Sequence, residues 1–122
     1  SDLEDILISL VKDLGHLESA KNTMTADIAE IERRLKKSIQ GAEMIRFNPF
    51  KDAGSNQSFA IAMLNEHGDG VVISSMYARE RMSVFAKPIK NHVSEYEMTE
   101  EEKEAVKKAK QSIKKPILEN AK

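Results

Sequence analysis

Residues 2–40 carry apolar side chains at alternating steps of three and four, and these collect at two heptad positions. The ten residues at these positions are Leu3, Leu7, Leu10, Leu14, Leu17, Lys21, Met24, Ile28, Ile31 and Leu35. All but Lys21 are apolar, a seam typical of a coiled coil, in which each helix buries its seam against another helix. We therefore predict a helix of roughly 55 Å, ended by Gly41, that forms a homo-oligomer through the nine apolar residues.

Two features of this segment allow more than one interpretation. Lys21 in the seam either fixes the register and number of helices at a cost in stability, or extends its alkyl stem to solvent and specifies nothing. Near the start, Ile6, Ile8 and Val11 widen the apolar stripe. This width indicates either more than two helices or an apolar neighbour at that end, such as a membrane.

After Gly41 the pattern changes to short runs of β-branched, aromatic and other apolar residues bounded by turn residues. The predicted strands cover residues 42–47, 58–65, 71–77 and 83–89. Their connections are a polar loop, 48–57, a glycine-containing hairpin turn, 67–70, and a charged segment, 78–82. Such closely spaced strands predict an antiparallel meander, and Pro88 is best accommodated at a strand end or on an edge.

A second helix is predicted from Thr99, because Thr99 and Glu102 have the spacing of a capping box. Its narrow apolar stripe, Ala105, Val106, Ala109 and Ile113, is expected to cover one face of the sheet. The predicted fold class is therefore α+β, with a long coiled-coil helix, a four-stranded antiparallel meander and a C-terminal helix. The predicted division is a stalk, 1–40, a β-rich domain with its helix, 41–115, and a tail, 116–122.

Composition narrows the classes of function. The chain has 122 residues, 32% of them charged, and a net charge of −1, so no overall field favours nucleic acid or an anionic membrane. It has no cysteine, which excludes disulfides and zinc–thiolate sites. It has no apolar run of about 18 residues. Because it begins at Ser1 and not at methionine, we expect a preceding segment in the full-length protein.

We predict no catalytic residue, no cofactor and no metal site. His16, His67 and His92 have no partner at metal-ligand spacing, and Asp69 between two glycines indicates a turn more than a calcium loop. No strand–turn–helix elbow surrounds any serine, and no phosphate-binding or dinucleotide motif occurs. A hydrolase-like activity is the alternative.

A basic cluster marks the predicted binding surface. Arg79, Arg81 and Lys87 offer cations for carboxylate or phosphate, and Phe50 and Asp52 lie in the long loop, where recognition residues often occur.

The alternative is a domain that responds to a small ligand, or binds an anion or nucleic acid, through the same cations with Tyr77 and Phe85. A plain charged turn with buried aromatic residues is a further interpretation. Residues 41–97 hold six basic and seven acidic residues, so we expect no nucleic-acid partner.

Several stretches in order resemble the bacterial domain of unknown function family 4446. They run from Ile45 to about Ala109 and include Arg46-Phe47-Asn48-Pro49-Phe50, Gln57-Ser58-Phe59-Ala60, Gly68-Asp69-Gly70-Val71-Val72, Ala78-Arg79-Glu80, Ala86-Lys87-Pro88 and Ser94-Glu95-Tyr96. The resemblance implies no established activity. It implies an N-terminal membrane anchor before the coiled coil, absent from this sequence, with the domain at the cytoplasmic side. The expected function is a non-enzymatic, oligomeric interaction or scaffold module with an unknown protein partner.

Overall fold

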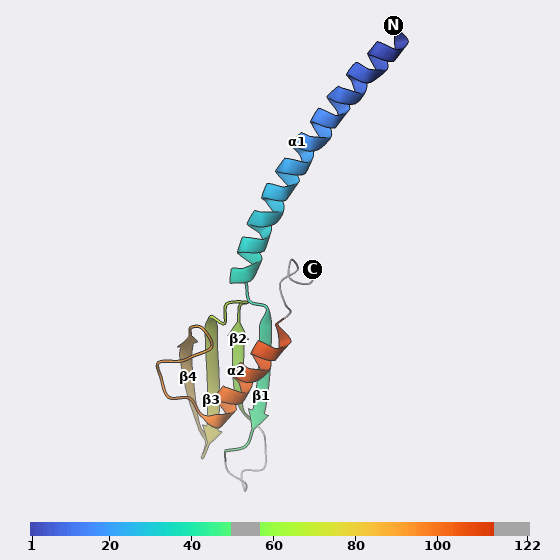
Figure 1. The fold of residues 1–122 in the computed structure, drawn as a ribbon. Coiled ribbons are helices and arrows are strands. Elements are labelled where there is room, and N and C mark those ends of the chain that lie inside the picture. Colours follow the sequence, from blue (N-terminus) through green and yellow to red (C-terminus); the bar gives the residue numbers. More distant parts are fainter. Residues whose placement is uncertain (50–56, 114–122) are drawn as a thin grey trace. The chain divides into compact units, whose positions relative to one another are not determined.

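The computed structural model describes residues 1–49 and 57–113 (Figure 1). The chain divides into two compact units, residues 1–35 and 36–122. The elements in chain order are α1 (Asp2–Lys37), β1 (Gly41–Phe47), β2 (Ser58–Leu64), β3 (Gly70–Ala78), β4 (Arg81–Ile89) and α2 (Glu100–Ser112). The predicted α+β class and the order of its elements are confirmed.

Helix α1 is a single uninterrupted helix of 36 residues. Its first turn holds Asp2, Glu4 and Asp5, whose charges favour the positive end of the helix dipole. No residue of α1 is buried. The nine apolar seam residues are each between 45% and 67% exposed.

The prediction that Gly41 ends this helix is wrong. The helix ends at Lys37, and Gly41 is the buried first residue of β1. A Cβ atom at this position would lie 2.3 Å from the Ala109 carbonyl oxygen of α2. Glycine is therefore needed here because β1 and α2 approach closely, not because the helix needs a stop.

The four strands form one antiparallel sheet in the order β1-β2-β3-β4, which confirms the predicted meander. Pro88 lies on β4, an edge strand, where a residue without an amide hydrogen is tolerated. Because neighbouring partners share a face and successive residues alternate between faces, the register assigns each strand residue to one side.

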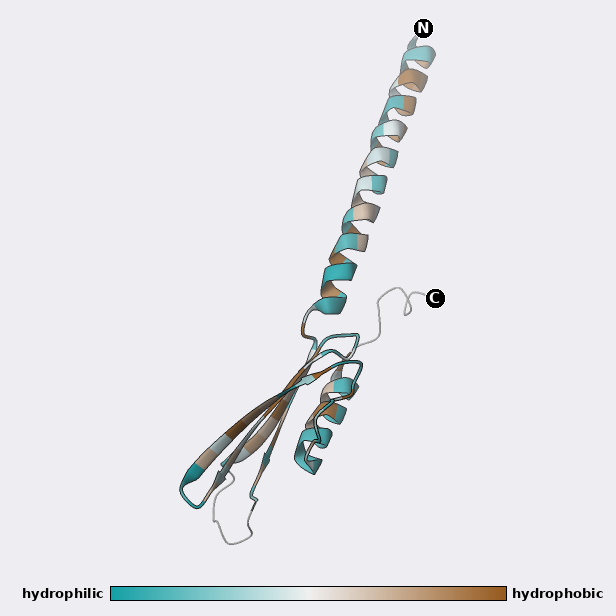
Figure 2. Ribbon diagram, turned by 90° about the vertical axis from the view of Figure 1, so that its left-hand side faces the viewer, coloured by the Kyte–Doolittle hydropathy of each residue, from teal (hydrophilic) through white to brown (hydrophobic). Residues whose placement is uncertain are grey.

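One face of the sheet is covered by α2 (Figures 1 and 2). The core between them is built from small and medium apolar residues: Ala60, Ala62, Leu64, Val72, Ile89, Ala105, Val106 and Ala109. Ile113 packs against this core, so the predicted stripe of α2 does contact the sheet. The alanines allow the helix to lie close to β1 and β2.

The opposite face, called the open face below, has a different composition. The register places on it Ala42, Met44, Arg46, Phe59, Ile61, Met63, Val71, Ile73, Ser75, Tyr77, Met82, Val84, Ala86 and Pro88. Among the described elements of this unit, none packs on the open face (Figure 2). Arg46 is its one charged residue.

The connection between β3 and β4 is shorter than predicted. Only Arg79 and Glu80 separate the strands, and both have positive φ, 51° and 64°. Two consecutive residues with positive φ are typical of a tight hairpin turn. The sequence concealed this turn because neither position holds the usual glycine or asparagine.

The turn between β2 and β3 is organised by Asn65. Its side-chain oxygen accepts hydrogen bonds from the His67 and Asp69 amides, both at 2.9 Å. The Asp69 carboxylate accepts from the Asn91 amide at 2.8 Å and so connects the turn to the segment that follows β4. Gly68 has a φ of +85°, and a Cβ there would lie 2.4 Å from the His92 ring.

Replacing Gly68 by alanine should lower the free energy of unfolding by about 1–3 kcal/mol, since the side chain adds a clash to an unfavourable backbone conformation. Urea unfolding followed by tyrosine fluorescence reports on this unit, because both tyrosines, Tyr77 and Tyr96, lie in it. His67→Ala, an exposed change in the same turn, is the matched control. Equal stabilities for the two variants would contradict this account of the turn.

Candidate functional site

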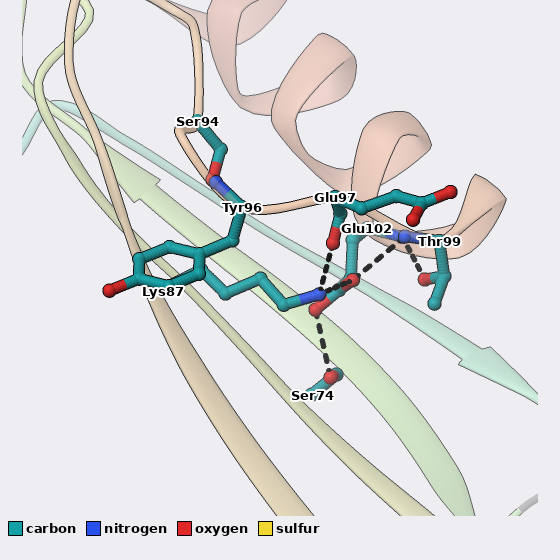
Figure 3. A network of polar contacts seen from close by, with 7 residues as sticks. All are labelled: Ser74, Lys87, Ser94, Tyr96, Glu97, Thr99 and Glu102. Atoms are coloured by element: carbon teal, nitrogen blue, oxygen red, sulfur yellow. Dashed lines mark hydrogen bonds and ion pairs between the residues drawn. The ribbon is translucent and has the colours of Figure 1, made fainter.

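The most elaborate polar arrangement in the described residues surrounds Glu102, a fully buried carboxylate in the first turn of α2 (Figure 3). One of its oxygens, Oε1, accepts from the Thr99 amide at 2.8 Å and from Lys87 Nζ at 2.7 Å. The other, Oε2, accepts from Ser74 Oγ at 2.9 Å. The Thr99 side chain in turn accepts from the Glu102 amide, which completes the predicted capping box.

Lys87 reaches this carboxylate because it lies on the covered face of β4, opposite Val72. Its ammonium group also donates to the Glu97 carbonyl oxygen at 2.7 Å. The side chain is 17% exposed, so the ion pair is largely shielded from water. Lys87 therefore connects β4 both to α2 and to the segment that precedes it.

The electrostatics of Glu102 depend on a balance. Burial by itself raises the pKa of the carboxyl group. The hydrogen bond from Lys87, those from Thr99 and Ser74, and the charge of Lys87 lower it by more, so the pKa lies below its usual value. The carboxylate is consequently ionised and fully paired at neutral pH.

This arrangement is suited to holding α2 on the sheet. It joins β3, β4, the segment before α2 and the first turn of α2 through one carboxylate. Among the described residues, no buried side-chain nitrogen or oxygen lacks a hydrogen-bond partner.

The predicted binding residues fall into separate places. Arg79 lies in the β3–β4 turn and Arg81 is the first residue of β4. Lys87 lies six residues further along β4, roughly 20 Å away at about 3.3 Å per residue. Phe50 and Asp52 lie outside the described residues. The role of these five residues in binding a partner stays a prediction.

The two aromatic residues beside the arginines lie on opposite faces of the sheet. Tyr77 is paired with Met82 on the open face, whereas Phe85 is paired with Ser74 on the covered face. Phe85 is nevertheless 53% exposed. The two rings therefore do not form one stacking surface of the kind that binds single-stranded nucleic acid.

A shallow groove beside α2 was not anticipated from the sequence. It is lined by His92, Met98, Lys103, Val106, Lys107 and Lys110. In the sequence, Lys103, Lys107 and Lys110 have the spacing of one helix face, which could have indicated one side of the groove. The sequence does not show that His92 and Met98, which precede α2, lie beside these lysines. The described residues contain no group of three or more potential metal ligands among His, Cys, Asp and Glu.

A family model described as protein of unknown function (DUF4446) matches residues 1–110. The chain belongs to this family. The match includes α1 as well as the sheet and most of α2, so the DUF4446 family is defined by both units. No curated protein matches the chain, and no solved structure does.

Membership of the DUF4446 family brings no activity with it. No helix in the described part of the chain combines the length and the apolarity that crossing a membrane requires.

Lys87→Met should lower the free energy of unfolding by about 2–3 kcal/mol, because it leaves a buried carboxylate without its cation. Lys103→Met is the matched control, since Lys103 forms an exposed ion pair with Glu100, and it should change stability by less than about 0.5 kcal/mol. Urea unfolding of both variants at pH 7 gives the comparison. Equal losses would mean that the Glu102 network does not stabilise the unit.

The lowered pKa of Glu102 also predicts a pH dependence. A carboxylate whose pKa is lower in the folded state stabilises fully above its unfolded pKa of about 4.3, and this contribution is lost as the pH falls through the folded pKa. Glu102→Gln keeps the capping-box spacing but cannot ionise.

The difference in unfolding free energy between the wild type and Glu102→Gln should therefore be constant near neutral pH and shrink below about pH 4.3. Urea unfolding of both proteins from pH 7 to pH 3 measures this difference. The contributions of all other carboxylates are common to the two proteins and cancel. A difference that grew as the pH fell would show that the folded pKa is raised instead.

Proposed function

We propose that the chain is a non-enzymatic oligomeric interaction module, in which α1 assembles with copies of itself and each copy presents one β-rich unit. The observation that supports this proposal is the state of the α1 seam. Nine apolar residues follow the heptad pattern over the whole helix, and none of them is buried by the part of the chain that the structure describes.

The magnitude of the apolar surface favours association. Full burial of one such side chain contributes about 1.5–3 kcal/mol. If association buries half of each seam residue, nine of them contribute on the order of 10 kcal/mol per helix, or about 20 kcal/mol for a pair. Association costs about 4–15 kcal/mol in lost translational and rotational freedom, so the balance favours an assembly.

Several copies on one stalk would bind a multivalent target more tightly than a single copy would. We place the contact with a protein partner at the β3–β4 turn, where Arg81 is exposed and Arg79 lies in the tight turn. In the full-length protein the module is proposed to lie at the cytoplasmic side of a membrane. This placement takes up the N-terminal anchor that the resemblance to the family implies.

The proposal is tested by placing charges in the seam and, in a control, on the side of α1 that carries no seam residue. The double variant Leu14→Glu with Ile28→Glu introduces two carboxylates into the predicted interface. Its dissociation constant in sedimentation equilibrium should rise by at least about 100-fold, because the charges must be buried or the helices separated.

The control carries the same charges on the opposite side of the helix, as Ser19→Glu with Ala26→Glu. It should associate like the wild type. A wild-type chain that is monomeric at millimolar concentration would remove the proposed function, and so would equal association of the two double variants.

A further inference from the structure

On the central strand β2, the open face carries larger apolar side chains than most of the covered face does. Along β2, the covered face presents Ala60 and Ala62, whereas the open face presents Phe59, Ile61 and Met63. Sheets with one solvated face usually alternate apolar and polar residues. A strand that is apolar on both sides is typical of a sheet that is buried on both sides, so this face needs a cover.

The composition of the open face selects the kind of partner. It has no acidic residue, and Arg46 on the edge strand β1 is its one basic residue. A strongly charged partner would therefore find little complementary charge, and an anionic lipid surface would find Arg46 alone in place of the several lysines and arginines that usually surround a lipid-binding face. An apolar, pleated surface is matched best by another pleated surface of the same kind.

A second copy of the same face meets this requirement. Two sheets pack face to face at about 10 Å when their strands cross at about 30°. A two-fold axis brings identical patches together, so the surface has to be complementary only to itself. Identical faces with one cation each, at one edge, do not bring like charges together at the centre.

The size of the face explains why such a pair would depend on α1. Four strands at about 4.8 Å and seven residues at about 3.3 Å give roughly 450 Å² per copy, or about 900 Å² for a pair. Stable interfaces bury about 1,200–2,000 Å², so the faces alone are too small. Residues 38–40 connect α1 to β1, so a stalk of parallel helices would hold the sheets of neighbouring copies at millimolar effective concentration.

We propose that the open face packs against the open face of a second copy, forming a closed β sandwich with α2 on each outer side. This inference rests on the proposed assembly through α1 and adds that the assembly contains an even number of chains, two in the simplest case. The β-rich units are then part of the oligomer interface, and Arg79 and Arg81 lie at the end of the sandwich.

Crosslinking of single-cysteine variants of the chain tests the proposal, because the wild type has no cysteine. Ile73→Cys places a thiol on the open face of the central strand β3, and Gln111→Cys places one on the exposed side of α2. A bis-maleimide of about 10 Å span matches the spacing of packed sheets. Val84→Cys, on the open face of the edge strand, replaces Ile73→Cys if that variant does not show the wild-type circular dichroism spectrum.

The proposal predicts that the open-face thiol is crosslinked to a dimer at least about tenfold faster than the α2 thiol, because the proposed pairing fixes one pair close together and keeps the other apart. Sedimentation of the same samples distinguishes the assembly through α1 from the pairing of the open faces. Oligomers without preferential open-face crosslinking would overturn the sheet pairing and leave the stalk in place. Monomers would remove the stalk, and the sheet pairing with it.

A lipid surface is the remaining candidate partner of the open face, and the same cysteine variants test for it. Vesicles of phosphatidylcholine, with and without phosphatidylglycerol, are added before the maleimide. The sheet pairing predicts an unchanged rate of open-face crosslinking. Flotation of the chain with vesicles, together with protection of the open-face thiol and no dimer, would assign the face to a lipid surface instead.

Discussion

Apolar surface has to be removed from water, and the described elements of this chain do not cover all that they carry. In α1 the seam from Leu3 to Leu35 remains exposed along the whole helix. In the β-rich unit, α2 covers one face of a sheet whose two faces are both apolar. The apolar residues of the seam follow a heptad repeat, and those of the open face follow the strand register. Neither set is scattered over the surface. Ordered apolar patterns are typical of surfaces that bind a specific partner.

The covered half of the sheet shows how the chain fixes a helix when it does supply the cover. Small residues, Ala105 and Ala109 in α2 against Gly41 in β1, bring the helix close to the sheet but contribute little apolar area. The Glu102 network then fixes the orientation of α2 through Lys87 and Ser74. Removal of one partner of a buried ion pair leaves the other charge unpaired, so the position of Lys87 on β4 and that of Glu102 on α2 depend on each other. The core itself is small, which makes the specific polar contacts matter more.

Much of this fold could be predicted from the sequence because its signals are local. The heptad repeat indicated α1, short apolar runs bounded by turn residues indicated the strands, and Thr99 with Glu102 indicated the start of α2. Signals that depend on distant segments were misread. Gly41 was interpreted as a helix stop, although its role is a close approach to Ala109, 68 residues away. The Arg79–Glu80 turn was lengthened because its residues are not those that favour positive φ.

The candidate site was less predictable than the fold. Lys87 was grouped with Arg79 and Arg81 by its charge and its nearness in sequence, but strand geometry places it at the other end of β4. Glu102 was recognised as a cap, yet its second role, as the partner of Lys87 and Ser74, depends on the packing of α2 against β3 and β4. The sequence of β2 shows apolar residues on both of its faces. It does not show that α2 covers the face of Ala60 and Ala62.

The central claim is that the excess apolar surface of one chain is buried by another. Isotope-filtered nuclear Overhauser spectroscopy on an equal mixture of methyl-labelled and unlabelled chains tests it most directly. The account predicts intermolecular contacts from seam methyl groups such as those of Leu14 and Ile28, and from Ile61 and Ile73 on the open face. Spectra at high concentration with no intermolecular contact to either set would contradict it.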